Sequence, residues 1–108
     1  MKEQWVPVYV KEFSDSYLVS NKGKVYSIRR KKFMTPSPNN VGALQVHFSN
    51  KGKIKSYLIN RLVYFSFKEI KDNKKIKDKQ NFFVKRNIVN PYSNELNNLY
   101  LYKIKSKL

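Results

Sequence analysis

The sequence predicts an α+β domain in which small β-hairpins pack with one central helix. Strand-forming residues flank the turn Ser-Asn-Lys-Gly at 20–23 and again at 49–52, and each of these two observations predicts a hairpin. A third predicts the helix, since apolar residues between 57 and 68 recur at intervals of four. The chain has 108 residues, enough for one modest core. We therefore expect one compact domain.

The first half of the chain is expected to be mostly extended. Residues 3–13 alternate apolar side chains, and Pro7 fits an edge strand because it has no backbone N–H to donate to a neighbour. The first hairpin is expected at 17–28, where Gly23 can take a positive φ without a Cβ clash. Residues 29–40 begin with a basic run and are expected to form a loop.

The second half is expected to hold a second hairpin and the central helix. The hairpin is predicted at 42–58 and the helix at 57–68, followed by a solvated, lysine-rich loop at 68–80. Farther on, Asn-Pro-Tyr-Ser at 90–93 predicts a turn. Ser93 is then expected to cap a short helix that continues through Leu99.

The charge of the chain points to a polyanionic partner. The formal net charge is +16, from 23 basic and 7 acidic residues. Such an excess destabilises the folded state by self-repulsion unless a polyanion neutralises it, which makes nucleic acid the first expectation and an anionic membrane surface the second. No apolar stretch reaches 18 residues and no long basic amphipathic helix is visible, so a membrane partner is not expected.

The absence of cysteine excludes disulfides and thiolate metal sites. The first residues have neither an apolar signal core nor an Arg- and Ser-rich leader. Abundant Lys, Asn, Ile, Tyr and Phe indicate an AT-rich genome. The localisation stays open between the cytoplasm of a low-GC bacterium or phage host and an organelle matrix such as the mitochondrion.

Both hairpin turns carry the same five residues, Ser-Asn-Lys-Gly-Lys, at 20–24 and 49–53. Two such turns in a chain with three glycines indicate paired basic tips that meet phosphates. The candidate contacts in and beside these tips are Lys22, Lys24, Arg29, Arg30, Lys31, Lys32, Lys51, Lys53 and Lys55.

Several motifs together resemble the HNH homing endonucleases, in which a nuclease-associated modular domain precedes the HNH module. They are Glu3-Gln-Trp5, the pattern Tyr17-x-Val-Ser-Asn-x-Gly-x-Val-x-Ser27, Leu44-Gln-Val46, Gly52-Lys53, Arg61-Leu-Val63 with Phe67, and the closing pattern Asn90-Pro-Tyr-Ser-Asn-Glu-Leu-Asn-Asn-Leu99. The resemblance implies a modular DNA-binding-like segment over 1–40. It implies a degenerate HNH-like module over 41–108, ending in a ββα-metal-like part.

The resemblance also implies where catalytic residues would stand. HNH chemistry needs a histidine to deprotonate water and a ligand set for a divalent ion. The family's Asn–His pair falls on Lys85 and Arg86, the Asp and Gly of the next turn fall on Ile88 and Val89, and the helix histidine falls on Asn60. Only Asn98 matches a metal-ligand position, and arginine cannot act as the base near neutral pH. The single histidine, His47, is distant in sequence from these positions and is expected on a strand surface.

From these positions we expect a catalytically dead relative with no metal and no other cofactor. Lys85 and Arg86 would then attract a phosphate backbone, and Arg61 joins the candidate nucleic-acid contacts. The expected function is non-catalytic nucleic-acid binding, with DNA as the partner that the resemblance implies. One alternative is a structural subunit on ribosomal RNA, beside other ribosomal proteins. An active HNH endonuclease ranks below both.

Overall fold

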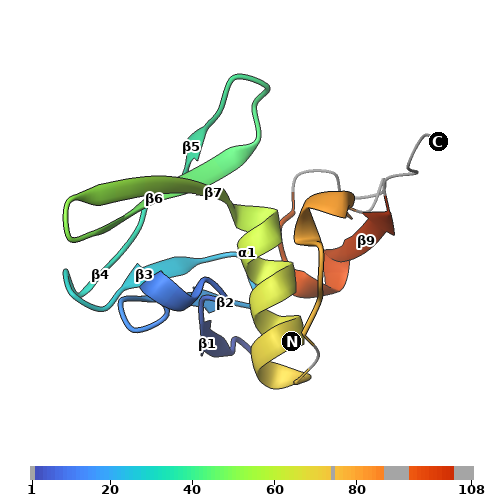
Figure 1. Cartoon of the computed structure of the whole chain (residues 1–108), viewed down its shortest axis with the longest axis horizontal. Helices are drawn as coiled ribbons and strands as arrows, with labels where there is room; N and C mark the ends of the chain where they lie inside the picture. The colour runs from blue at the N-terminus through green and yellow to red at the C-terminus, as the bar shows by residue number, and fades with distance from the viewer. Residues whose placement is uncertain (1, 74, 87–92, 104–108) are drawn as a thin grey trace.

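The computed structural model describes residues 2–73, 75–86 and 93–103 (Figure 1). The strands are β1 Trp5–Pro7, β2 Tyr17–Ser20, β3 Val25–Ser27, β4 Lys32–Phe33, β5 Ser37–Pro38, β6 Leu44–Asn50, β7 Lys53–Leu58, β8 Phe82–Arg86 and β9 Leu99–Lys103. The helices are α1 Ile59–Ser66, a π-helical turn at Phe67–Lys71, and 3₁₀ turns at Lys11–Phe13, Lys79–Asn81 and Leu96–Asn98.

Three antiparallel sheets surround α1. Their strand orders are β1-β2-β3-β4, β5-β6-β7 and β8-β9. In Figure 1 the first two sheets lie on one side of α1 and the β8–β9 hairpin lies on the other. This arrangement confirms the α+β class, the two predicted hairpins, the central helix and the position of Pro7 on an edge strand.

The hydrophobic core joins both halves of the chain around α1. Phe13 and Phe48 are fully buried with Leu62 and Phe65 of the helix, each with 0% of its surface exposed. The ring of Tyr17 stacks on that of Phe48 at 4.0 Å between centroids. Burial of apolar surface is the dominant favourable term in folding, and these rings contribute much of it, so the first hairpin, the second hairpin and α1 are held as one unit.

The predicted loop at 29–40 is wrong in part, because it contains two short strands. Phe33 of β4 pairs with Tyr26 of β3, and Ser37 of β5 pairs with Gln45 of β6. Thr35 and Ser37 each precede a proline, and a residue before proline is restricted to extended conformations. The prolines that suggested an irregular loop therefore favour strand geometry here.

The C-terminal segment also differs from the prediction. The helix expected from Ser93 to Leu99 is only the 3₁₀ turn Leu96–Asn98, and the chain then enters β9. Leu99 pairs with Arg86 in the β8–β9 ladder and is buried, so its packing favours a strand over a longer helix. The predicted turn at 90–93 lies outside the described residues except for Ser93.

The lysine-rich segment at 68–80 begins as a helix. The π-helical turn extends α1 to Lys71, and Lys79 forms an ion pair with Glu69 at 2.9 Å. In the described part of the chain, every helix is too short or too polar to cross a bilayer.

Candidate nucleic-acid interface

The turn between β3 and β4, together with the first residue of β4, carries the four consecutive cations Arg29–Lys32, all of them exposed. Lys31 has a φ of +54°, a left-handed conformation that reverses the chain. The N–H of Arg30 donates to Ser27 Oγ at 3.3 Å and anchors the start of the turn. A short, anchored turn thus holds four positive side chains close together in solvent.

The turn between β6 and β7 consists of Lys51 and Gly52, between the paired residues Asn50 and Lys53. Both turn residues have positive φ, +51° and +81°, which defines a type I′ turn that matches the twist of the strands. Lys51 and Lys53 are exposed. We call Arg29–Lys32 together with Lys51 and Lys53 the basic turns.

The first Ser-Asn-Lys-Gly-Lys segment has a different structure from the second. Ser20 and Asn21 are buried, and Ser20 Oγ accepts hydrogen bonds from the N–H groups of Lys22 and Lys24, each at 3.1 Å. Gly23 has a φ of +86° and packs against Asn94. The side chains of Lys22 and Lys24 extend from a backbone that lies against the C-terminal segment. The pair of equivalent tips expected from the sequence is therefore not formed.

Two further cations proposed from the sequence are engaged within the protein. Lys55 Nζ lies 2.8 Å from Glu12 Oε1, and this hydrogen bond raises the pKa of Lys55. Arg61 points inward, where Nη1 donates to Phe82 O at 2.8 Å and Nη2 donates to Lys79 O at 2.9 Å. The sequence suggested a phosphate contact for Arg61. In the structure its side chain instead bridges α1 to the start of β8 and the residues just before it.

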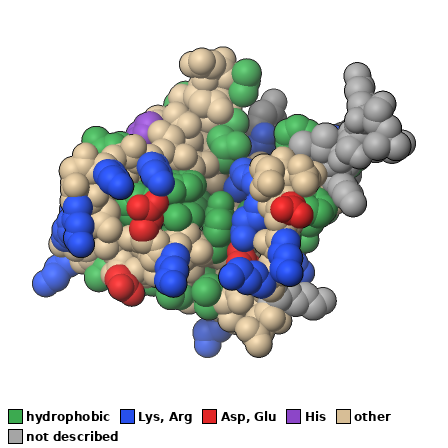
Figure 2. Space-filling view, in the orientation of Figure 1, with side chains coloured by type: hydrophobic (Ala, Val, Ile, Leu, Met, Phe, Trp, Pro, Cys, Tyr) green, Lys and Arg blue, Asp and Glu red, His purple; other side chains and the backbone are tan. Residues whose placement is uncertain are grey.

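The basic turns have no acidic partner among the residues that the structure describes. Among the described residues, the lysines that form ion pairs are Lys55, Lys68 and Lys79, and none of them belongs to the basic turns. Figure 2 shows Lys and Arg side chains spread over the hairpins and again over the C-terminal hairpin, with few acidic side chains between them. Exposed cations without local partners are available to an external polyanion.

Asn60, Val84, Lys85 and Arg86 line a hollow of about 310 Å³ at the β8 face of α1. Asn60 Nδ2 donates to Val84 O at 2.7 Å. Lys85 Nζ lies 4.0 Å from the ring centroid of Tyr102, and Arg86 Nη1 donates to Asn94 Oδ1 at 3.3 Å. The family resemblance aligns Asn60, Lys85 and Arg86 with catalytic positions, and the fold brings the three residues together around this hollow.

This donor set does not fit the divalent ion of HNH chemistry. Two cationic side chains repel a metal, and Asn60 Oδ1 already accepts a hydrogen bond from the N–H of Arg61 at 2.8 Å. In the described residues no three His, Cys, Asp or Glu side chains gather as a metal site. Asn98 donates to Ser93 O through its side-chain amide, while Ile88 and Val89 lie outside the described residues.

The only histidine of the chain lies on the second sheet, away from this hollow. His47 is exposed on β6, with Nδ1 2.6 Å from Ser56 Oγ. It borders a groove of about 330 Å³ that Arg30, Lys32 and Phe33 also line. Sequence patterns do not reveal this groove, because it forms where the β3–β4 turn of the first sheet meets β6 of the second.

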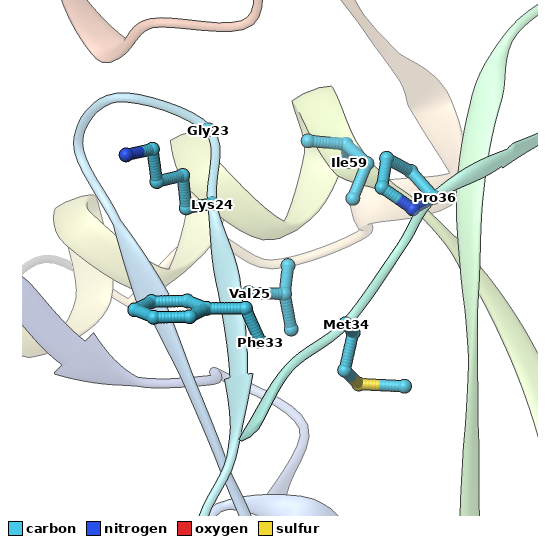
Figure 3. Close-up of a pocket in the computed structure, with 7 residues that line it drawn as sticks. All are labelled: Gly23, Lys24, Val25, Phe33, Met34, Pro36 and Ile59. Atoms are coloured by element: carbon cyan, nitrogen blue, oxygen red, sulfur yellow. The ribbon is translucent and has the colours of Figure 1, made fainter.

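A more apolar pocket of about 300 Å³ lies between β3, the segment after β4 and the start of α1 (Figure 3). Val25, Met34, Pro36 and Ile59 form its walls, and Lys24 and Phe33 stand at its edge. No local pattern in the sequence indicates it, since its residues come from the β2–β3 turn, β3, β4, the segment after β4 and the first residue of α1.

Comparison with known proteins gives consistent matches. The NUMOD4 motif family matches residues 3–49. An uncharacterised HNH endonuclease of Acanthamoeba polyphaga mimivirus is 32% identical over 77 residues, which is 69% of this chain and 19% of the relative. The solved structure of the HNH homing endonuclease I-HmuI, described as binding and cleaving DNA, superposes with a TM-score of 0.71 at 25% identity. That match covers 93% of this chain and 52% of I-HmuI.

The chain thus spans about a fifth of the viral relative and about half of I-HmuI. The expectation of a non-enzyme is wrong on these findings, because the relatives are named as HNH endonucleases. The differences at Lys85, Arg86 and Asn60 do not by themselves show that activity is absent. Neither relative is named as a ribosomal protein or an RNA-binding protein. The motif, the sequence relative and the fold all relate the chain to the HNH homing endonuclease family.

Proposed function

We propose that the chain binds double-stranded DNA and supplies DNA recognition for cleavage by an HNH homing endonuclease. The observation that carries this proposal is the set of basic turns, six exposed cations that no acidic side chain in the described structure neutralises. I-HmuI, whose fold the chain shares over 93% of its length, is described as binding and cleaving DNA.

The basic turns are suited to phosphates rather than to base edges. Lysine and arginine that neutralise phosphates release condensed counterions, so their contribution to affinity depends strongly on salt. The turn Arg29–Lys32 and the turn at Lys51–Lys53 belong to two different sheets. Two separate basic turns can contact a DNA backbone at two points, and this fixes the orientation of the protein on the duplex.

The hollow beside Lys85 and Arg86 would supply a third contact. Lys85 is exposed and Arg86 is half-buried, so both cations can face a phosphate at the rim of the hollow. We assign residues 1–40 to the modular DNA-binding segment and 41–108 to the HNH-like module. On this assignment the third contact lies on the HNH-like module and the turn at Arg29–Lys32 lies on the modular segment.

A salt series of duplex DNA binding tests the proposal. The affinity of the wild-type chain, measured by fluorescence anisotropy, should fall linearly on a log–log plot of binding constant against salt. The double variant Lys51→Gln/Lys53→Gln should reduce the magnitude of the slope by about 0.9 for each phosphate contact that is lost. The matched control Lys75→Gln/Lys77→Gln removes two exposed lysines of the lysine-rich segment and should leave the slope unchanged.

The same preparations should be incubated with supercoiled plasmid and magnesium or manganese to measure nicking directly. If Lys51→Gln/Lys53→Gln and Lys75→Gln/Lys77→Gln lower the magnitude of the salt slope equally, the basic turns are not the interface. Absence of duplex binding at low salt would reject the function itself.

A further inference from the structure

The outer face of the first sheet is aromatic and partly exposed. Tyr26 pairs with Leu18 on one side and with Phe33 on the other, so these three side chains share one face of the sheet. Trp5 of β1 completes the group, with its ring centroid 6.4 Å from that of Tyr26 and 5.8 Å from that of Phe33. Tyr26 and Phe33 are themselves 5.2 Å apart at 72°. We call these four residues the aromatic face.

The aromatic face is hollowed rather than flat. Trp5, Leu18, Tyr26 and Phe33 line a depression of about 250 Å³. Phe33 is 61% exposed, although the opposite face of the same sheet buries Val19 and Val25 in the core. A large ring left in water next to other rings has an apolar surface that a ligand can still bury.

Phe33 also stands at the border of a cationic groove. The groove that it shares with Arg30, Lys32 and His47 has a volume of about 330 Å³. One residue thus separates an apolar depression from a positively charged one. A nucleotide has the complementary structure, because a planar base is linked through its sugar to a negatively charged phosphate.

We propose that the aromatic face binds unpaired bases of DNA, with the adjoining phosphates on Arg30 and Lys32. Stacking on aromatic rings does not require a particular base, and it needs bases that are not already stacked in a duplex. The site would therefore act where the DNA is single-stranded or opened. This inference rests on the proposed DNA binding and adds a second, distinct mode of contact to it.

The charge around the aromatic face favours DNA over a protein partner. Charged residues are depleted at the core of protein–protein interfaces, whereas here the exposed run Arg29–Lys32 adjoins Phe33 directly. Single-stranded DNA can pair its phosphates with the cations and stack its bases on the aromatic side chains, while an apolar protein surface would leave the cations unpaired.

The chain contains a single tryptophan, so Trp5 fluorescence reports on the aromatic face directly. Titration with oligothymidylate should quench or shift the Trp5 emission. Phe33→Ala should lower the affinity for oligothymidylate by about tenfold or more, in the range that stacking on an aromatic ring contributes. The same variant should leave the affinity for blunt duplex DNA within about twofold, since the basic turns that neutralise phosphates stay intact.

Phe83→Ala is the matched control, because Phe83 is also an exposed phenylalanine on a strand, 52% exposed on β8. It should leave the oligothymidylate affinity unchanged, and Phe33→Tyr should retain most of it. Circular dichroism of each variant confirms that the fold is intact.

Three outcomes would overturn the inference. One is an equal loss of oligothymidylate affinity in Phe33→Ala and Phe83→Ala. Another is Trp5 emission that does not change while the oligonucleotide binds. The third is Trp5 emission that follows protein concentration instead of DNA, with a dimer in sedimentation equilibrium, which would make the face a protein interface. Each can occur with duplex binding intact, so it is distinguishable from a failure of the proposed function.

Discussion

The backbone N–H of Leu96 donates a hydrogen bond of 2.7 Å to the carbonyl oxygen of Asn21. The side chain of Asn21 continues this link, because its Oδ1 accepts from the N–H of Gln4 at 2.9 Å and its Nδ2 donates to Lys2 O at 3.1 Å. Asn21 therefore joins three segments that are separate in sequence: the residues just before β1, the first hairpin and the C-terminal segment. Only 3% of its surface is exposed.

We predict that Asn21→Ala lowers the free energy of unfolding by about 1–3 kcal/mol, because it removes two long-range hydrogen bonds from a buried position. Urea denaturation measures the change. Asn50→Ala serves as the control, since the side chain of Asn50 makes one exposed hydrogen bond, to Glu12 O. An equal loss of stability in both variants would contradict the linking role of Asn21.

Gly23→Ala should be more destabilising than Gly52→Ala. Both glycines have strongly positive φ, +86° and +81°, so both substitutions strain the backbone, by about 1 kcal/mol. Only at Gly23 would the added Cβ also meet another segment, 3.2 Å from Asn94 Cβ and from Asn94 O. Thermal denaturation of the two variants separates strain from steric conflict. Equal melting temperatures would show that the segment around Asn94 moves away from the added Cβ without a measurable loss of stability.

Arg61→Ala should lower the free energy of unfolding by about 2–4 kcal/mol, because it breaks two charge-assisted hydrogen bonds to backbone carbonyls. The guanidinium also lies 4.9 Å from the ring centroid of Phe65, which adds a cation–π contact. Arg61→Lys should restore less than half of the loss, since an ammonium cannot reach two carbonyls in the planar geometry of arginine. Urea denaturation measures both. Full rescue by lysine would show that charge alone matters here.

The stability of the chain should depend on Tyr9 at alkaline pH. Burial raises the pKa of the Tyr9 phenol above its ordinary value of 10.0, although the nearby Arg61 partly opposes this. The folded state thus favours the neutral phenol, so this part of the stability is complete below about pH 10 and is lost as the pH rises through the folded pKa.

Tyr9→Phe removes the titrating group and keeps the ring that packs on Phe65. The wild-type chain should therefore lose stability relative to Tyr9→Phe as the pH rises above about 10. Chemical denaturation at a series of alkaline pH values measures the difference. A difference that stays constant across the series would contradict the prediction.

Local patterns in the sequence were sufficient for the elements that depend on local chemistry. The turn at Lys51–Gly52 forms as predicted, because glycine and its polar neighbours tolerate positive φ and the flanking residues favour strands. The period-four apolar residues predicted α1, whose Leu62 and Val63 are buried. The net charge of +16 indicated a nucleic-acid partner, because a polyanion relieves the self-repulsion of so large an excess.

Tertiary contacts decided the rest. The five residues Ser-Asn-Lys-Gly-Lys have the same propensities at 20–24 and at 49–53. The first copy nevertheless packs against Asn94 and Leu96, whereas residues 51–53 of the second copy are exposed to solvent. Likewise, Arg61 turns inward because two backbone carbonyls of a later segment lie within its reach. A local sequence determines which backbone shapes are available, whereas long-range packing determines which side chains remain exposed to bind a partner.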